Sequence, residues 1–474
     1  MKNSNINSKL AQHPYNFYRC QSPGAPLRPA PKISANYNPI YTGYREMLFA
    51  STDYKIKRSA EEFKPYEALL SRWSDTEWEG DYTGDTLATW MKSTPNNEGR
   101  KLFNQALEAG IDSVTDAPQI MKDFFKQVDA TPHLFDMEKV QKGADVLADL
   151  SPIMHYLANT SLMWTSTTLG PVSRMVGATG RFLDVANSLS RFVETSSYVV
   201  GDVSSANVFQ RDSPSLKTGV NVRLMHSLIR NQVIKSTDEN VVDFENRGHP
   251  ISMRVGANGG MMFSLYCIWY SASLGRKYSR EDYENCAELA RCISYINGID
   301  YEWLPKDYDE CCLYIDHSLA MCEGQTVYTE GLNKAFYSGI PQLLAERQSS
   351  KIMSKLMAVT TPISQGFLLG INQWSYGEEI FEGMPGMPKR AAWPKYLFML
   401  VKFMRPKVLT LDQMIPGYET RIIKRRIKHR EFTNKKFVSL VAKLMKRSDS
   451  AEIKMTYDSH DHSSEKDLKS AEKQ

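Results

Sequence analysis

The feature that most constrains this chain is an apolar helical segment, residues 222–230, that carries a charged stripe. Arg223, His226 and Arg230 stand at positions i, i+3 and i+7, so on a helix they share one face. The remaining residues of the segment are mostly apolar, which predicts that the rest of the helix is buried. Burying an arginine costs free energy unless a neighbouring group interacts with its positive charge. The segment therefore predicts a helix whose polar face serves an interior site.

A second segment, residues 191–198, has the same organisation. Arg191, Glu194, Thr195 and Tyr198 stand at i, i+3, i+4 and i+7, again on one helix face, within the apolar sequence RFVETSSYVV. Two apolar helices that both carry an arginine-containing stripe predict a binding or catalytic site between them.

Helical periodicity extends through most of the chain, and no strand pattern or repeat is visible. In the segment 136–150, apolar residues that fall on one helix face are expected to face the core; they are Val140, Ala144, Leu147 and Leu150. Ser279 followed by Asp282 indicates a capped helix start. The 474 residues contain 42% hydrophobic and 24% charged residues, values typical of a soluble globular protein. We expect a mainly α fold with a single large helical domain.

Composition divides the chain into four parts. Residues 1–45 are rich in Pro, Asn and Ser and predict an extended arm, and residues 46–400 form the helical domain. Residues 401–447 are basic and amphipathic, and residues 448–474 are predicted to be a disordered tail. From 388 to 447 there are 17 Lys and Arg but three acids, so the rest of the chain is net acidic. This C-terminal charge favours contact with an anionic membrane surface, and a solvated helix face or a contact with nucleic acid stays open as the alternative.

The beginning of the chain has no apolar stretch typical of a secretory signal. We therefore expect an intracellular protein, cytoplasmic or peripherally attached to a membrane. The seven cysteines have no CxxC spacing and are expected to be reduced thiols of the core. The scattered histidines, His155, His249 and His317, are interpreted as core or loop residues. No glycine-rich phosphate loop is present, which argues against a nucleotide or nicotinamide enzyme.

The charged stripe of residues 222–230 matches what haem requires from a protein. Haem needs a neutral imidazole for its iron, apolar walls for the porphyrin and cations for two propionates. His226 is the candidate ligand, and Arg223 and Arg230 are the candidate cations. A simpler interpretation stays open: His226 is a hydrogen-bonded core residue, and the two arginines pair with acids in a structural network.

The two stripes resemble the signature of the haem-dependent MpaB-type oxygenases and rubber oxygenases (latex-clearing proteins). That family's pattern is Arg-x-x-x-Thr followed by Arg-x-x-His-x-x-x-Arg. Arg191 and Thr195 match the first part, and the second is matched by Arg223, His226 and Arg230. Thr195 and His226 are 31 positions apart, close to the family's spacing. The similarity covers roughly residues 130–310 and also includes the downstream helices of the family's catalytic domain.

The resemblance implies a globin-like helical core that holds haem b, with His226 as the proximal ligand. Arg191 and Thr195 then belong to the distal pocket, where they would polarise bound O₂. Glu194 stands where characterised rubber oxygenases can carry a lysine able to cap the iron. The resemblance therefore does not imply that a lysine ligates the iron in this chain. Glu194 is instead the candidate base that removes a proton from the substrate. The missing export signal argues against an extracellular polymer such as rubber as the substrate.

The sequence thus predicts a haem b-dependent oxygenase that uses O₂ to oxidise or cleave an apolar, unsaturated or prenylated small molecule. The alternative is a haem-binding sensor or carrier without turnover. A third interpretation, a helical protein without a cofactor, predicts colourless preparations.

Overall fold

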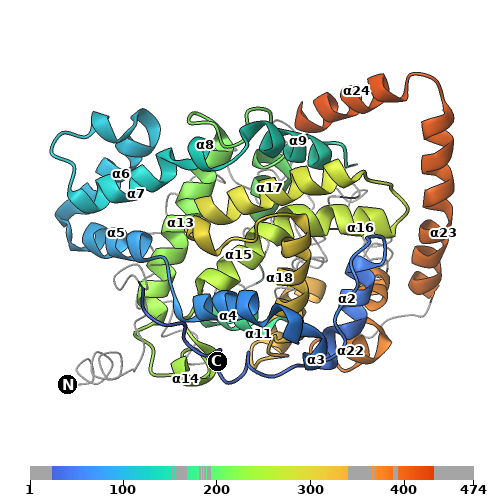
Figure 1. Ribbon diagram of the computed structural model, residues 1–474, viewed down its shortest axis with the longest axis horizontal. Coiled ribbons are helices and arrows are strands. Elements are labelled where there is room, and N and C mark those ends of the chain that lie inside the picture. The colour runs from blue at the N-terminus through green and yellow to red at the C-terminus, as the bar shows by residue number, and fades with distance from the viewer. Residues whose placement is uncertain are drawn as a thin grey trace, which may run out of the picture.

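The computed structural model of the protein describes residues 24–150, 168–180, 194–339, 369–387 and 393–431, together with six single positions between them. All regular secondary structure in these residues is helical (Figure 1). The predicted mainly α fold is confirmed.

The N-terminal part of the chain forms short α-helices joined by 3-10 turns, labelled η. The α-helices are α2 (Thr42–Phe49), α3 (Ala60–Phe63), α4 (Glu67–Asp75), α5 (Tyr82–Ser93), α6 (Glu98–Ala109), α7 (Gln119–Asp129), α8 (Thr131–Leu134) and α9 (Met137–Ala148). The turns are η2 (Pro39–Tyr41), η3 (Lys64–Tyr66), η4 (Thr76–Trp78), η5 (Pro95–Asn97) and η6 (Ile111–Ser113).

The central and C-terminal parts contain the longer helices. They are α11 (Gly170–Ala178), α13 (Pro214–Val233), α14 (Phe244–Arg247), α15 (Met253–Met261), α16 (Cys267–Ser273), α17 (Arg280–Ile296), α18 (Tyr308–Ala320), α19 (Thr329–Asn333), α22 (Glu378–Glu382), α23 (Trp393–Met414) and α24 (Tyr418–Glu431). One further 3-10 turn is η9 (Tyr301–Trp303). Three segments are π-helices: η7 (Ser197–Asp202), η8 (Met262–Tyr266) and η10 (Lys334–Gly339).

Helix α17 lies in the middle of the molecule, packed between α9 and α15 (Figure 1). The predicted cap is confirmed: the Asp282 backbone N–H donates to Ser279 Oγ (3.1 Å), and the Ser279 backbone N–H donates to Asp282 Oδ2 (2.8 Å). Gly143 of α9 stands against the Asn285 carbonyl oxygen, where an added Cβ would come within 2.4 Å. The absence of a side chain there lets α9 approach α17 closely.

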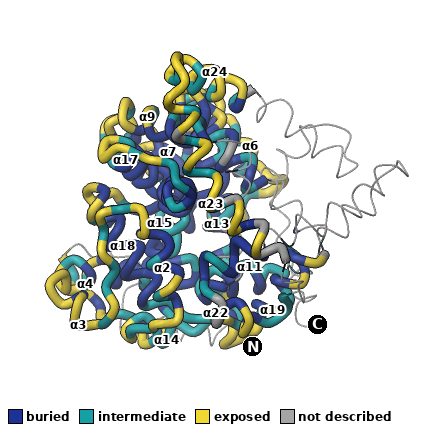
Figure 2. The backbone as a smooth tube through the Cα atoms, turned by 90° about the vertical axis from the view of Figure 1, so that its right-hand side faces the viewer, coloured by how far each residue is buried: buried dark blue, intermediate teal, exposed yellow. Residues whose placement is uncertain are grey.

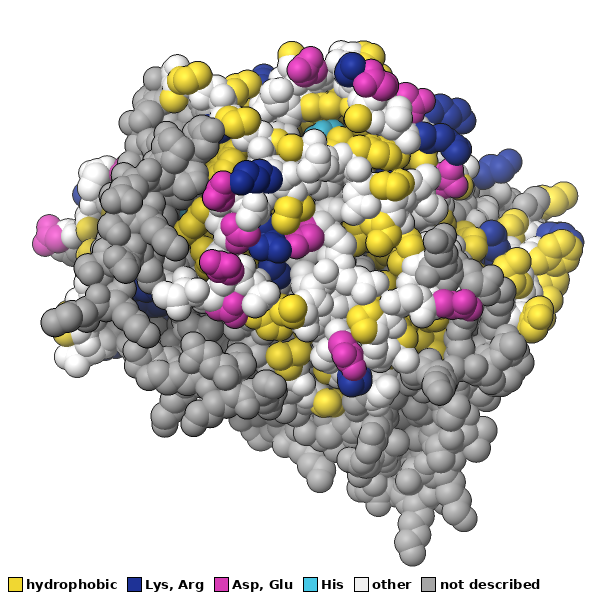
Figure 3. Space-filling view, turned by 90° about the horizontal axis from the view of Figure 1, so that it is seen from below, with side chains coloured by type: hydrophobic (Ala, Val, Ile, Leu, Met, Phe, Trp, Pro, Cys, Tyr) yellow, Lys and Arg dark blue, Asp and Glu magenta, His cyan; other side chains and the backbone are white. Residues whose placement is uncertain are grey.

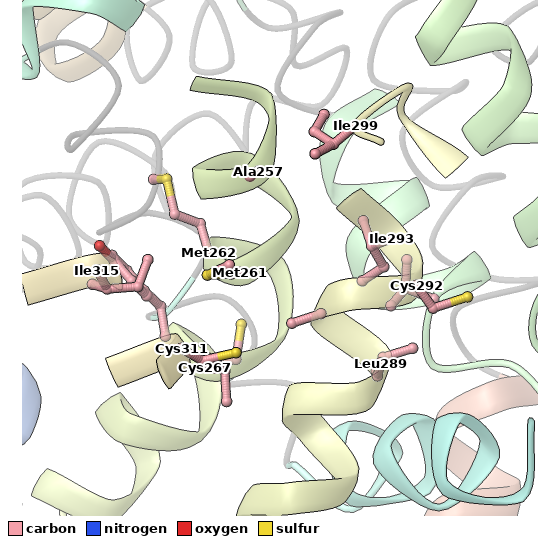
Figure 4. Close-up of a cluster of buried hydrophobic side chains, with 14 of the residues drawn as sticks. Ala257, Met261, Met262, Cys267, Leu289, Cys292, Ile293, Ile299, Cys311 and Ile315 are labelled. Atoms are coloured by element: carbon pink, nitrogen blue, oxygen red, sulfur yellow. The ribbon is translucent and has the colours of Figure 1, made fainter. Parts of the chain in front are cut away.

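Apolar side chains of α17 and of neighbouring helices form one buried cluster (Figure 4). Leu289, Cys292 and Ile293 of α17 belong to the same buried cluster as Met261 of α15 and Ile315 of α18. The four residues predicted to face the core from α9 are buried, as expected; they are Val140, Ala144, Leu147 and Leu150. The six cysteines that the structure describes are all free, and five of them are buried.

The N-terminal arm is held to the helical body by a buried arginine and by further hydrogen bonds, such as that from Trp78 Nε1 to the Pro29 carbonyl oxygen (2.6 Å). Arg28 is buried, and its Nε donates to Asp75 Oδ1 (2.8 Å) while its Nη2 donates to Glu79 Oε1 (2.6 Å). Residues 25–31 have no helix, and helical structure starts with η2 and α2, a few residues before the predicted boundary at 45. Residues 1–23 and the predicted tail, 448–474, lie outside the described residues.

No helix in the described part of the chain combines the length and the apolar character needed to cross a bilayer. The uncharged stretch 151–173 lies largely outside the described residues.

Candidate functional site

The predicted helix around residues 222–230 is α13, which runs for 20 residues. It begins where Ser213 Oγ accepts a hydrogen bond from the Leu216 backbone N–H (3.2 Å), with Pro214 at the first helical position. Val220, Leu224 and Leu228 are buried along its length. The charged stripe therefore lies on a helix that is fixed at its start and packed on its apolar side.

One face of α13 borders a cavity of about 410 Å³, within the size range of small-molecule and cofactor sites. His226 lines this cavity together with apolar residues of its own helix. Other apolar walls come from α11, α15, η8, η10 and the loop before α14; they include Val172, Met175, Val241, Val255, Met262, Phe263 and Phe336. The cavity is thus a mainly apolar space with a histidine in its wall.

The imidazole of His226 is held neutral. Burial, and then the positive charge of Arg230, lower the pKa of His226 to about 4, although the Asp81 carboxylate acts in the opposite direction. At neutral pH the ring therefore carries one proton and keeps one nitrogen lone pair, the form that binds a metal.

The side chains of Arg223 and Arg230 bind acidic residues at the start of α5 and do not line the cavity. Arg223 Nε donates to Asp81 Oδ2 (2.6 Å), and Arg230 Nη2 donates to Asp85 Oδ1 (2.6 Å). Both arginines are buried, and neither belongs to the described residues that line the cavity. Burial alone would raise the pKa of Asp81, but the charge and hydrogen bonds of Arg223 outweigh it and lower that pKa. Arg223 and Arg230 therefore pair with acids in a structural network, which is the simpler interpretation that the sequence left open.

Glu194 and Thr195 from the second stripe do reach the cavity. Both line it, and the Glu194 side chain is buried. Tyr198, at the end of the same stripe, lines it too and packs edge-on against Phe263 with ring centroids 6.1 Å apart. The structure therefore brings Glu194 and Thr195 to the same cavity as His226. Arg191 lies outside the described residues.

All three π-helical segments border this cavity. Tyr198 belongs to η7, Met262 and Phe263 belong to η8, and Phe336 belongs to η10; all four line the cavity. A π-helical turn is rare in proteins and is frequently found at functional sites. The position of these segments supports the cavity as the functional site.

His249 is a cavity residue that sequence reasoning missed. Its Nδ1 lies 2.9 Å from the Pro250 carbonyl oxygen, which is an acceptor, so the ring proton belongs on Nδ1. Burial, followed by the charge of Arg230, lowers the pKa of His249 to about 3. A single histidine in the loop sequence RGHPI carries no periodic signal, and only the fold places it in the wall of the cavity.

Three further arginines line the cavity: Arg174, Arg247 and Arg254. Arg174 Nη1 lies 2.6 Å from Glu323 Oε2, and Arg247 Nη2 donates to Glu323 Oε1 (2.9 Å), so two cations share one carboxylate. Arg247 is the last residue of α14, on the underside of the molecule, where acidic and basic side chains stand together among apolar ones (Figure 3).

Acidification of the cofactor-free protein is expected to reduce its stability. The pKa values of His226 and His249 lie below 6.5, the value of an unfolded histidine. As the pH falls, the unfolded chain therefore binds more protons than the folded chain does. Each histidine then removes about 1.4 kcal/mol per pH unit between pH 6.5 and its folded-state pKa. Urea unfolding at pH 7 and pH 5 measures the loss. His249→Gln should reduce it and His133→Gln, at an exposed position, should not; equal losses in both variants would contradict the assignment.

The fold and the cavity define an all-helical protein built around an apolar chamber with His226 in its wall. A solved structure of similar fold is that of latex clearing protein in the closed state, with a TM-score of 0.55 and 15% sequence identity. The similarity covers 75% of this chain and 90% of that chain, and at this identity it shows a shared fold. No family model matches the chain, and no curated protein matches it.

Proposed function

We propose that this protein is a haem b-dependent oxygenase that uses O₂ to oxidise or cleave an apolar, unsaturated small molecule. The observation that carries the proposal is the apolar cavity that is lined by a neutral His226 and also by Glu194 and Thr195. The fold similarity to latex clearing protein supports the same class of chemistry.

The cavity residues fit haem in two of the three features that such a site needs. His226 supplies a neutral imidazole, and the apolar walls suit a porphyrin. The expected cations, Arg223 and Arg230, pair with Asp81 and Asp85 and do not line the cavity. Arg174 and Arg247, which pair with Glu323, and Arg254, whose Nε lies 3.7 Å from Glu77 Oε1, do line it. We therefore propose that the propionates are met by the arginines that line the cavity, which are Arg174, Arg247 and Arg254.

Bound haem would supply the redox-active iron at which O₂ is activated. The chain's own contribution is to exclude water, to orient an apolar substrate and to manage protons. Thr195 would donate a hydrogen bond to a ligand in the cavity, and Glu194 would accept a proton from the substrate. Removal from water makes both interactions stronger than they would be on the surface.

An absorption spectrum tests the proposal most directly. The purified protein, as isolated or after addition of hemin, is expected to show a Soret band with one equivalent of haem. The reduced protein is then incubated with O₂ and a lipid extract, and oxygenated products are sought by mass spectrometry. A Soret band without product would favour the haem sensor or carrier. Protein that stays colourless with hemin would contradict the proposal.

Glu194→Gln is expected to keep haem but to slow product formation by about 10²- to 10⁴-fold, because the amide cannot accept the proton. Oxygen uptake and product mass measure the rate, and the Soret band confirms the haem content. Met225→Leu, a volume-conserving change in the same cavity, is the control and should keep most of the activity. An unchanged rate in Glu194→Gln would remove Glu194 from the mechanism.

A further inference from the structure

Helix α23 exposes an unusually large apolar face. Eight of its large apolar side chains are more than one-third exposed: Tyr396, Met399, Leu400, Phe403, Met404, Val408, Leu411 and Met414. Successive members of this set are one, three or four residues apart, so they share one broad side of the helix. In the rest of the described chain, exposed apolar residues of this size are few and scattered, apart from Ile415 beside α23 and two isoleucines of α24. Soluble monomers rarely leave such a contiguous apolar surface open to water.

The opposite side of α23 is held to the body of the protein, so the exposed side is fixed in orientation. Phe398 is buried and packs on Trp374, with ring centroids 5.3 Å apart. Arg405 Nη1 donates to the carbonyl oxygens of Ser271 (3.1 Å) and Leu274 (2.8 Å) at the end of α16. Figure 1 shows α23 at the outer edge of the molecule, and Figure 2 shows exposed stretches along α23 and α24.

The sequence that carries this apolar face is rich in positive charge. Between positions 402 and 430 the chain has nine Lys and Arg but only two acids, Asp412 and Glu419. Lys407 lies on the apolar side with its ammonium 3.7 Å from the centroid of the Phe403 ring, a position from which its charge can reach a polar headgroup. Lys424 and Lys428 of α24 are exposed.

Part of the positive charge of the basic C-terminal segment is already paired with acids of the helical body. Arg426 is bound by Asp145 and Asp149, and Arg430 is bound by Asp145, so much of the charge on α24 fastens that helix to α9. The apolar side of α23 is therefore the largest exposed apolar surface of the C-terminal segment, and Lys407, Lys424 and Lys428 are the cations of this segment considered with it.

We infer that α23 lies in the interface of a membrane that contains anionic lipids, with its apolar side among the acyl chains and its lysines at the headgroups. An apolar arc with this width and flanking positive charge is typical of helices that lie in the plane of a bilayer surface. A narrower apolar seam would be expected for pairing with a second copy of the chain. The inference is independent of haem and of catalysis.

Vesicle co-sedimentation of the full-length protein tests the inference. Wild-type protein should bind phosphatidylcholine vesicles containing phosphatidylserine, bind pure phosphatidylcholine more weakly, and lose affinity as salt is raised. Phe403→Glu/Leu411→Glu should bind at least about tenfold more weakly, because two apolar anchors are replaced by charges. Leu27→Glu/Val327→Glu is the matched control, since it makes the same charge change at two other exposed apolar positions and should bind as the wild type does.

Three outcomes would overturn the inference. The first is wild-type protein that stays in the supernatant with anionic vesicles. The second is equal binding by wild type and Phe403→Glu/Leu411→Glu. The third is concentration-dependent dimerisation in light scattering, lost in that variant and without vesicle binding, which would assign the apolar side to a second copy. Circular dichroism melting checks that both double variants stay folded.

Discussion

His226→Ala is expected to lose haem, with an affinity reduced at least about a hundredfold. Loss of the groups that merely orient a metal ligand already costs 10- to 100-fold, and this variant removes the ligand itself. Hemin titration followed at the Soret band measures the affinity. His226→Gly with added imidazole should recover part of the band, because the free ring can occupy the space left by the side chain.

His249→Ala is the matched control for that experiment, because His249 lines the same cavity and is also held neutral. It should keep the Soret band of the wild type. A full Soret band in His226→Ala, together with loss of the band in His249→Ala, would identify His249 as the iron ligand. A full band in both variants would contradict ligation by either histidine.

Asp85→Ala is expected to lower the free energy of unfolding by about 3–5 kcal/mol, because it leaves the Arg230 guanidinium buried without its carboxylate. Asp85→Leu/Arg230→Met, which removes both charges, should recover much of that loss. Glu330→Ala, in an exposed ion pair with Lys334, is the control and should cost less than about 1 kcal/mol. Urea unfolding of the cofactor-free proteins gives the three values.

The same variants decide between the two roles considered for Arg230. If Arg230 served a propionate, Asp85→Ala would leave stability nearly unchanged and Arg230→Met would weaken haem binding. If Arg230 has the structural role, Asp85→Ala instead lowers the free energy of unfolding strongly. It also predicts that the double variant is more stable than Asp85→Ala alone, since no charge is then left buried.

Local sequence determined the helices themselves. The capping pair Ser279 and Asp282, the buried face of α9 and the helical course of α13 were all readable, because capping and a 3.6-residue periodicity act within a few turns of one segment. The same periodicity put Glu194 and Thr195 on one helix face and His226 on the charged face of another helix. Their convergence on one cavity was expected from the resemblance, and the structure brings these three residues to its walls.

Only the tertiary structure decided which partner each charged residue meets. Arg223 and Arg230 are separated from Asp81 and Asp85 by 142 and 145 positions, and nothing local in the sequence distinguishes these carboxylates from a cofactor's. The structure likewise added His249 and Arg174 to the cavity wall and left one side of α23 uncovered. Helix formation depends on neighbours along the chain, whereas burial and ion pairing depend on which distant helices pack together, and that packing is a property of the whole fold.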